Sequence, residues 1–285
     1  MAVVMLGMIL AACSHAPSPA DRSRHAREIA ARAGMIGEVV EAGRFRLQSY
    51  HRGLDDTGTE RGVHVYIEGD GLAYLDRRRR SPDPTPVDPL GLRLAAADPY
   101  PRVIYVARPC QYIGGPACNP QVWTTGRFTV EQVVAMKEAV DRLAGGRSVE
   151  ILVGYSGGGT VATLLADPPP VLRGHLPDPG SRICALVTVA SPLALADWTA
   201  YHHVTPLAGA LDPAGHAESG DDIPMAHLVG QSDRIVPPVV QQRYTAGHPA
   251  SRLIPLPGFD HHCCWAENWP RLLRQAIPGE PACRM

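Results

Sequence analysis

The sequence lacks an excess of charge of either sign and lacks an apolar run long enough to cross a bilayer. Its 285 residues include 27 Lys or Arg and 28 Asp or Glu, which leaves a formal net charge of −1. Because no global positive field results, the composition argues against nucleic acid as a partner. The apolar stretch at the N-terminus is about a dozen residues long, whereas a membrane-spanning helix needs about 20. No internal repeat is present.

What is abundant is apolar side chains, which make up 45% of the chain. That fraction is enough for the core of one large α/β domain or two small ones. Strand-like runs alternate with helix-like runs through most of the sequence. The expected strands lie at 43–52, 62–71, 102–109, 148–155, 183–192, 225–233 and 251–260, and the expected helices at 21–35, 90–99, 129–146, 158–166, 237–247 and 268–277. This alternation predicts an α/β fold with a mostly parallel central sheet and helices on both faces.

The first residues, MAVVMLGMILAAC, predict an export signal. Leu10-Ala11-Ala12-Cys13 resembles the lipobox of bacterial lipoproteins, in which cleavage precedes a cysteine that is then lipidated. The resemblance implies a signal peptide over 1–12, a lipid on Cys13 and, because Ser14 follows, anchoring in the outer membrane facing the periplasm. No Lys or Arg precedes the apolar stretch, so an uncleaved apolar N-terminus is the alternative. We expect a tether and short helix over 13–39 and one domain over 40–285.

The remaining cysteines fit an oxidising compartment. Cys110 and Cys118 enclose a short Gly/Pro loop that a disulfide would close. We expect Cys283 to pair with Cys263 or Cys264, and Cys184, in an apolar run, to be a buried free thiol. A zinc site at HHCC, residues 261–264, is the alternative use of that pair, but four consecutive residues do not converge easily on one tetrahedral ion. We therefore predict no metal and no cofactor.

The stretch EILVGYSGGGTVATLL, residues 150–165, carries the strongest functional signal. A strand that enters G-x-S-x-G and continues as a helix is typical of a nucleophile elbow, in which a strained turn exposes the serine. The helix beginning at Gly157 directs its backbone N–H groups toward charge that develops beside Ser156. A glycine-rich turn with an idle serine is the alternative interpretation.

A nucleophilic serine needs a base and a group that orients the base. Asp233 ends one expected strand and His261 ends the next, and parallel strands bring such residues to the edge of the sheet where Ser156 lies. His262 is the alternative base if the loop is offset by one residue. Asp260 is the alternative acid, although its position next to the histidine favours a role in shaping the loop.

Three segments, GYSGG, GQSDRIVP and PGFDH, resemble the catalytic motifs of the α/β-hydrolase superfamily, and YIEGDG, ARPCQY and GFDHHCCW resemble an uncharacterised proteobacterial group within it. The resemblance covers roughly residues 40 to 277. It implies that Ser156 is the nucleophile, His261 the general base and Asp233 the carboxylate that orients the imidazole.

An oxyanion hole is also expected, with one N–H from Gly157 and a second from Asp70, in the loop after the strand VHVYI. That loop has Glu68 and Asp70 where relatives have His-Gly. Two carboxylates beside a developing oxyanion are unfavourable, so we expect both side chains to point away. A plain turn is the alternative for this loop.

The stretch 191–224 predicts a small cap or pocket insertion, with Trp198, Tyr201 and Leu207 as pocket candidates. It is short for a lipase lid, which favours small or soluble esters. Arginines 77–80 form either a solvated charge run or a contact with anionic lipid. The sequence thus predicts a serine hydrolase that cleaves carboxylic esters through an acyl-enzyme. Thioester or peptide cleavage, acyl transfer, an idle envelope binding protein and a zinc-dependent hydrolase are the alternatives.

Overall fold

The computed structural model describes residues 16–55, 62–178, 180–216, 223–248, 251–279 and 283. Cys13 and the predicted signal peptide lie outside the described residues. The strands are β1 (Ile36–Ala42), β2 (Phe45–Arg52), β3 (Val63–Ile67), β4 (Val103–Val106), β5 (Val149–Tyr155), β6 (Leu186–Val189), β7 (Met225–Gly230) and β8 (Ser251–Leu256). The helices are α1 (Pro19–Arg32), α2 (Leu90–Ala97), α3 (Pro120–Trp123), α4 (Val130–Ala144), α5 (Gly157–Ala166), α6 (Pro170–Arg173), α7 (Leu195–Tyr201), α8 (Val239–Gly247) and α9 (Trp269–Ala276), with the short 3₁₀ turns η1 (Pro213–Gly215) and η2 (Ala266–Asn268).

The strands form one eight-stranded sheet in the order β1-β2-β4-β3-β5-β6-β7-β8. From β4 through β8 every neighbouring pair is parallel, whereas β1–β2 and β2–β4 are antiparallel. The sequence pattern does not predict β1, which begins the sheet at Ile36, inside the segment expected to precede the domain. Because β3 and β5 lie side by side, the loop after β3 meets the turn after β5 at one edge of the sheet.

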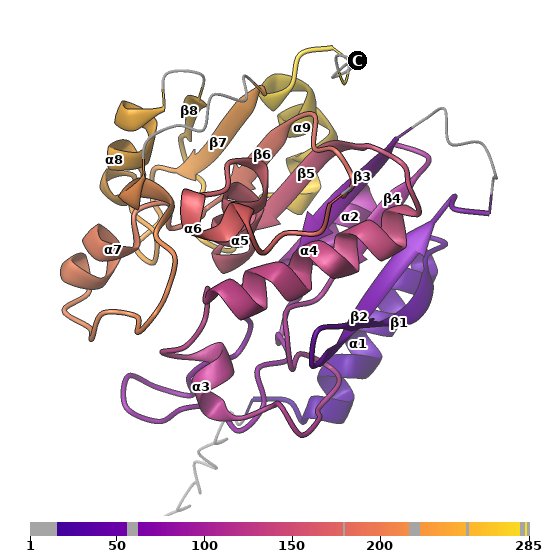
Figure 1. The fold of residues 1–285 in the computed structure, drawn as a ribbon, viewed down its shortest axis with the longest axis horizontal. Helices are drawn as coiled ribbons and strands as arrows, with labels where there is room; N and C mark the ends of the chain where they lie inside the picture. The colour runs from indigo at the N-terminus through magenta and orange to yellow at the C-terminus, as the bar shows by residue number, and fades with distance from the viewer. Residues whose placement is uncertain are drawn as a thin grey trace, which may run out of the picture.

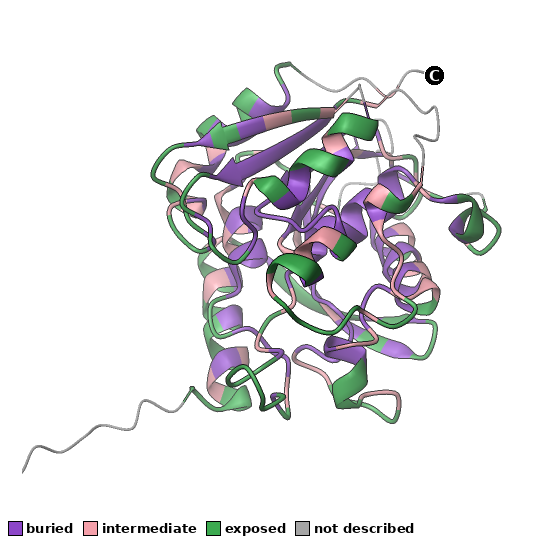
Figure 2. Ribbon diagram, turned by 90° about the vertical axis from the view of Figure 1, so that its left-hand side faces the viewer, coloured by how far each residue is buried: buried purple, intermediate pink, exposed green. Residues whose placement is uncertain are grey.

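Both faces of the sheet are covered by helices, as the mostly parallel sheet requires. On one face α4 and α5 pack against Val65, Ile67 and Leu152, and on the other α1, α2 and α9 pack against Tyr66 and Tyr105. Figure 1 shows α4 and α5 in front of the sheet and α1, α2 and α9 behind it. In Figure 2 the central strands and the inward sides of the helices are buried, while the outer helix faces and parts of the edge strands are exposed. Among the described residues, no helix is long and apolar enough to span a membrane.

Of the cysteine predictions, one is confirmed and two are wrong. Cys110 and Cys118 form the predicted disulfide, with 5.6 Å between their Cα atoms. Cys184 is buried but is not a free thiol, because it is bonded to Cys283. Cys263 and Cys264 are bonded to each other, so neither pairs with Cys283. The sequence pattern missed the Cys184–Cys283 pair because the two cysteines are 99 residues apart and only the tertiary structure brings them together.

Candidate active site

Ser156 lies in a strained turn between β5 and α5. Its φ of 49° and ψ of −125° are a conformation that side-chain-bearing residues rarely adopt. The turn is tight because α5 packs directly on the sheet. A Cβ on Gly154 would overlap the Gly158 carbonyl, and a Cβ on Gly158 would overlap the carbonyls of Ile67 and Glu68. The flanking glycines therefore let the helix approach β5 and β3 while the serine hydroxyl stays accessible.

Ser156, His261 and Asp233 are hydrogen-bonded in sequence. His261 Nε2 lies 3.2 Å from Ser156 Oγ, and His261 Nδ1 lies 2.8 Å from Asp233 Oδ2. The imidazole and the carboxylate are buried, with side-chain exposures of 7% and 0%. An Nδ1–H that donates to Asp233 leaves the Nε2 lone pair facing the hydroxyl, which is the arrangement a general base needs.

Hydrogen bonds from neighbouring residues hold Asp233 and His261 in place. The other carboxylate oxygen of Asp233, Oδ1, accepts N–H bonds from Ile235 and Val236 at 2.8 and 2.7 Å, so the loop after β7 fixes the carboxylate. The carbonyl of His261 accepts hydrogen bonds from Tyr155 Oη at 3.1 Å and from Trp265 Nε1 at 3.3 Å. Asp233 thus orients the imidazole of His261, while Tyr155 and Trp265 hold its backbone.

The alternative acid and base lie elsewhere in the loop. His262 is exposed, and its Nδ1 lies 3.4 Å from Tyr155 Oη rather than next to Ser156 or Asp233. Burial and the charge of His261 lower the pKa of His262. Asp260 Oδ1 accepts the N–H groups of His262 and Cys263 at 2.8 and 2.7 Å, and these bonds lower its pKa. Asp260 therefore stabilises the loop, and His261 alone bridges the serine and the buried carboxylate.

Of the two acidic side chains in the loop after β3, one points away from the serine as expected and the other does not. Glu68 does turn away from the serine: it accepts the N–H groups of Gly91 and Leu92 at the start of α2, at 3.1 and 3.3 Å, and the Tyr105 hydroxyl at 3.0 Å. Burial raises the pKa of Glu68 to about 7, against the opposing effect of these hydrogen bonds.

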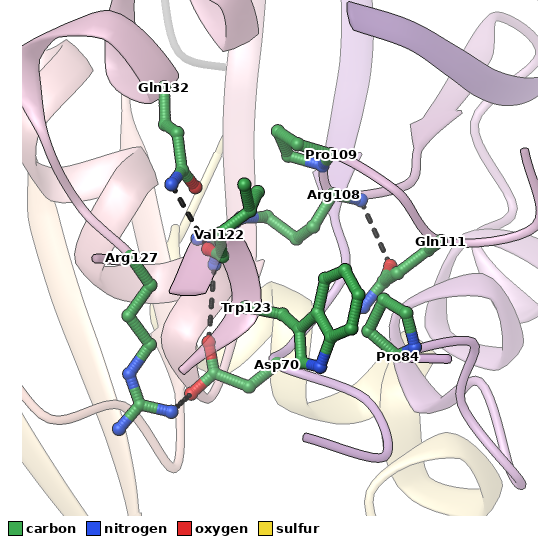
Figure 3. A pocket seen from close by; sticks show the side chains of 9 residues that line it. All are labelled: Asp70, Pro84, Arg108, Pro109, Gln111, Val122, Trp123, Arg127 and Gln132. Carbon is green, nitrogen blue, oxygen red and sulfur yellow. Dashed lines mark hydrogen bonds and ion pairs between the residues drawn. The ribbon is translucent and has the colours of Figure 1, made fainter. Parts of the chain in front are cut away.

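The expectation that the Asp70 carboxylate points away is wrong. A Cβ on Gly157 would overlap the Asp70 carboxylate, which therefore lies directly beside the predicted oxyanion donor. Two buried arginines make this possible: Arg127 Nη1 lies 2.8 Å from Asp70 Oδ2, and Arg108 Nη1 lies 3.5 Å from Oδ1 (Figure 3). Burial lowers the pKa of Arg108 to about 10, while Asp70 raises it and Arg127 lowers it further. The cluster of two guanidinium groups and one carboxylate carries a net positive charge at neutral pH.

Ser156 and His261 open into a cavity of about 510 Å³. Most of its lining is apolar, including Phe128, Leu195 and Val236. Its charged members are Glu68, Asp70, Asp88 and Arg127. Volumes of this size accommodate small and medium-sized ligands.

Among the three predicted pocket residues, Trp198 lines the cavity. Its Nε1 donates to the Ile235 carbonyl at 2.8 Å, which ties α7 to the loop that carries Asp233. Tyr201, at the end of α7, is 52% exposed and contacts His202, and Leu207 packs against the core. Neither is among the residues that line the cavity.

Comparison with solved structures finds the same arrangement of strands and helices in serine hydrolases. An esterase from Thermogutta terrifontis, with propionate bound, has a TM-score of 0.58 at 14% identity, over 88% of this chain and 97% of that one. A serine hydrolase homologue from Coxiella burnetii has a TM-score of 0.54 at 12% identity, over 85% and 96%. A serine hydrolase without a lid from Xanthomonas campestris has a TM-score of 0.53 at 15% identity, over 88% and 97%.

The chain has the α/β-hydrolase fold. No family model matches its sequence, and no curated protein is significantly similar to it. In this fold Ser156, Asp233 and His261 follow β5, β7 and β8, at the carboxyl ends of parallel strands.

Sequence reasoning missed two groups of residues. Arg108 and Arg127 have no motif of their own, and only the tertiary structure brings them to Asp70. Asp167, His216 and His248 form the group among the described residues whose side-chain atoms are arranged to hold a metal ion. They are far apart in the sequence, and no spacing rule connects them. The HHCC segment is not part of this group.

Proposed function

We propose that this protein is a serine hydrolase that cleaves carboxylic esters through an acyl-enzyme intermediate. The observation that carries the proposal is the hydrogen-bonded series Ser156–His261–Asp233, at the mouth of a mostly apolar cavity. The solved structures of similar fold include esterases and serine hydrolases, which supports the same reaction class.

The geometry suits a reaction in two steps, formation of the acyl-enzyme and then its hydrolysis. Ser156 Oγ attacks the ester carbonyl carbon while its proton passes to His261 Nε2, and the tetrahedral intermediate collapses as that proton is given to the leaving alcohol. A water molecule then attacks the acyl-enzyme with His261 as the base. The acid leaves and the serine is regenerated. Asp233, fixed by two backbone N–H groups, holds the imidazole in position and stabilises its charged form.

The oxyanion that forms in each of these two steps needs hydrogen-bond donors and a favourable local charge. Gly157 N–H, at the first turn of α5, is the first donor, and the backbone N–H of Asp70 is the second. The positive charge of the Arg108–Arg127–Asp70 cluster favours a negative charge at this position, even though a carboxylate lies beside it. The cavity volume of about 510 Å³ favours small to medium acyl esters as substrates.

Labelling with a fluorophosphonate probe tests the proposal. We expect stoichiometric labelling of the purified chain, mapped by mass spectrometry to Ser156, and loss of labelling in Ser156→Ala and His261→Ala. Ser148→Ala is the matched control, because Ser148 directly precedes β5 at the end opposite Ser156. The unlabelled chain would then be assayed with short acyl esters, thioesters and peptides, with the labelled chain as the inactive control. A folded chain that takes no label would contradict the proposal and favour a binding protein of hydrolase fold.

A further inference from the structure

Three residues from separate segments meet on the side of the molecule away from Ser156. Asp167 directly follows α5, His216 directly follows η1 and His248 directly follows α8. One ligand atom from each lies within 4.8 Å of the others. Their side chains are 0%, 9% and 1% exposed. Because α5 has ten residues, its length of about 15 Å separates this group from the serine turn.

The distances between these atoms suit a shared cation. His248 Nε2 lies 3.0 Å and His216 Nε2 lies 3.6 Å from Asp167 Oδ2. Ligand atoms at 2.0–2.1 Å from a tetrahedral zinc ion are about 3.4 Å apart. The two measured separations lie on either side of that value. Small side-chain movements would therefore bring these atoms to the spacing of ligands around a tetrahedral zinc ion.

The orientation of His248 supplies an independent argument. Its Nδ1 lies 2.8 Å from the Tyr244 carbonyl, and its ring stacks on Tyr244 with 3.9 Å between centroids. A carbonyl can only accept, so Nδ1 carries the proton and a neutral ring directs the Nε2 lone pair toward the Asp167 carboxylate. Among the described residues, His248 Nε2 is buried and has no partner with hydrogen-bond geometry, although Asp167 Oδ2 lies 3.0 Å away. A backbone carbonyl that holds the far nitrogen of an imidazole is the usual second partner of a metal-bound histidine.

His216 has a competing interaction that metal binding would replace. Its Nε2 lies 3.2 Å from the backbone carbonyl of Asp167, within hydrogen-bonding distance. Coordination through Nε2 exchanges this hydrogen bond for a metal–nitrogen bond, and the ring stays neutral because its proton is transferred through solvent from Nε2 to Nδ1. His216 Nδ1 is also buried and without a hydrogen-bond partner in the described part of the chain, so it is available to bond to water or backbone once the ring turns.

We propose that Asp167, His216 and His248 bind one Zn²⁺ ion, with water as the fourth ligand. Two imidazoles and a carboxylate are a donor set that zinc favours. The role of the ion is structural: it ties the segment between β6 and β7, which carries Trp198 of the cavity, to the ends of α5 and α8. A protonated His248 paired with Asp167, without a metal, is the competing arrangement of the same atoms.

Zinc titration of the purified full chain, after treatment with a chelator, tests this proposal. We expect one tightly bound Zn²⁺ per chain, measured by competition with a chromophoric chelator. We also expect a rise in Tm of about 5 °C or more when free zinc is about 100 times its Kd. Substitution of Co²⁺ should give the strong visible absorption of a four-coordinate ion.

His216→Gln and His248→Gln should weaken zinc binding roughly 100-fold or more, since even residues that only support a ligand change metal affinity 10- to 100-fold. His175→Gln, at an exposed histidine outside the group, should bind zinc as the unchanged chain does. Circular dichroism and Tm in chelator check that each variant folds. No binding by the folded, unchanged chain would overturn the proposal in favour of the ion pair. Undiminished binding by both variants would also overturn it, because the ion would then bind elsewhere.

Discussion

His261 and His262 are adjacent in the sequence, yet only His261 has a neighbour on each ring nitrogen that fits the proposed reaction. We expect His261→Ala to lower kcat/KM for a short acyl ester by about 10³-fold or more, because the serine loses its base. His262→Ala should lower it by less than about tenfold. Steady-state kinetics on both folded variants measures the difference, and equal losses would contradict the assignment of the base.

Arg127 offsets the charge of Asp70 beside the proposed oxyanion donor. We expect Arg127→Gln to lower kcat roughly 10- to 100-fold, because the Asp70 carboxylate would then repel the oxyanion. Two like charges about 6 Å apart repel each other by about 3 kcal/mol at an effective dielectric constant of about 20. The double variant Asp70→Asn/Arg127→Gln should recover most of that loss. Failure of the double variant to recover would show that Arg127 acts through packing and not through charge.

Glu68 makes stability depend on pH, because burial raises its folded-state pKa to about 7 from an ordinary 4.5. Between these values the folded chain holds a proton that the unfolded chain has released. The contribution is therefore fully present below pH 4.5 and is lost as the pH rises through about 7, by about 3 kcal/mol in total. Denaturation at a series of pH values should show a decline in this window that Glu68→Gln lacks. Parallel curves for the two chains would contradict the raised pKa.

The turn between β5 and α5 depends on close approach of backbone to backbone. Gly158→Ala would overlap the carbonyls of Ile67 and Glu68, which flexible side-chain motion cannot relieve. We expect a loss of about 1–3 kcal/mol in the free energy of unfolding, together with lower activity, because the shift displaces α5 from Ser156. Gly174→Ala is the matched control, since a Cβ there meets nothing within 4 Å and its φ of −70° suits alanine. Urea denaturation compares the two, and equal midpoints would contradict this account.

Helices and strands with a clear periodic pattern of apolar residues are predicted well from the sequence, and those without such a pattern are missed. The amphipathic helix expected at 129–146 is α4, ended by Gly145 in the left-handed conformation, although Thr129 makes no side-chain cap bond. β1 is exposed at most of its positions, carries Glu38 and Glu41, and pairs only with β2 at the edge of the sheet, so no long apolar run marks it. The short helices α3, α6 and α7 likewise have too few turns to show a period.

The N-terminal sequence makes a prediction about the whole molecule. If Cys13 carries a lipid, Cys13→Ala should move the protein from the membrane fraction to the soluble fraction of the expressing cell, with esterase activity in detergent unchanged. Cell fractionation followed by immunoblotting measures this. A chain that stays with the membrane after the substitution would contradict lipid anchoring through Cys13.

The sequence by itself determined the parallel α/β architecture and the order of serine, acid and histidine, because both depend on local patterns. Apolar periods mark the strands and helices, and parallel strands place the residues that follow them at one edge. Only the tertiary structure decided the partners that come from distant segments: the arginines beside Asp70, the Cys184–Cys283 bond and the meeting of Asp167 with His216 and His248. Such contacts depend on the path of loops that carry no periodic signal, so no spacing in the sequence encodes them.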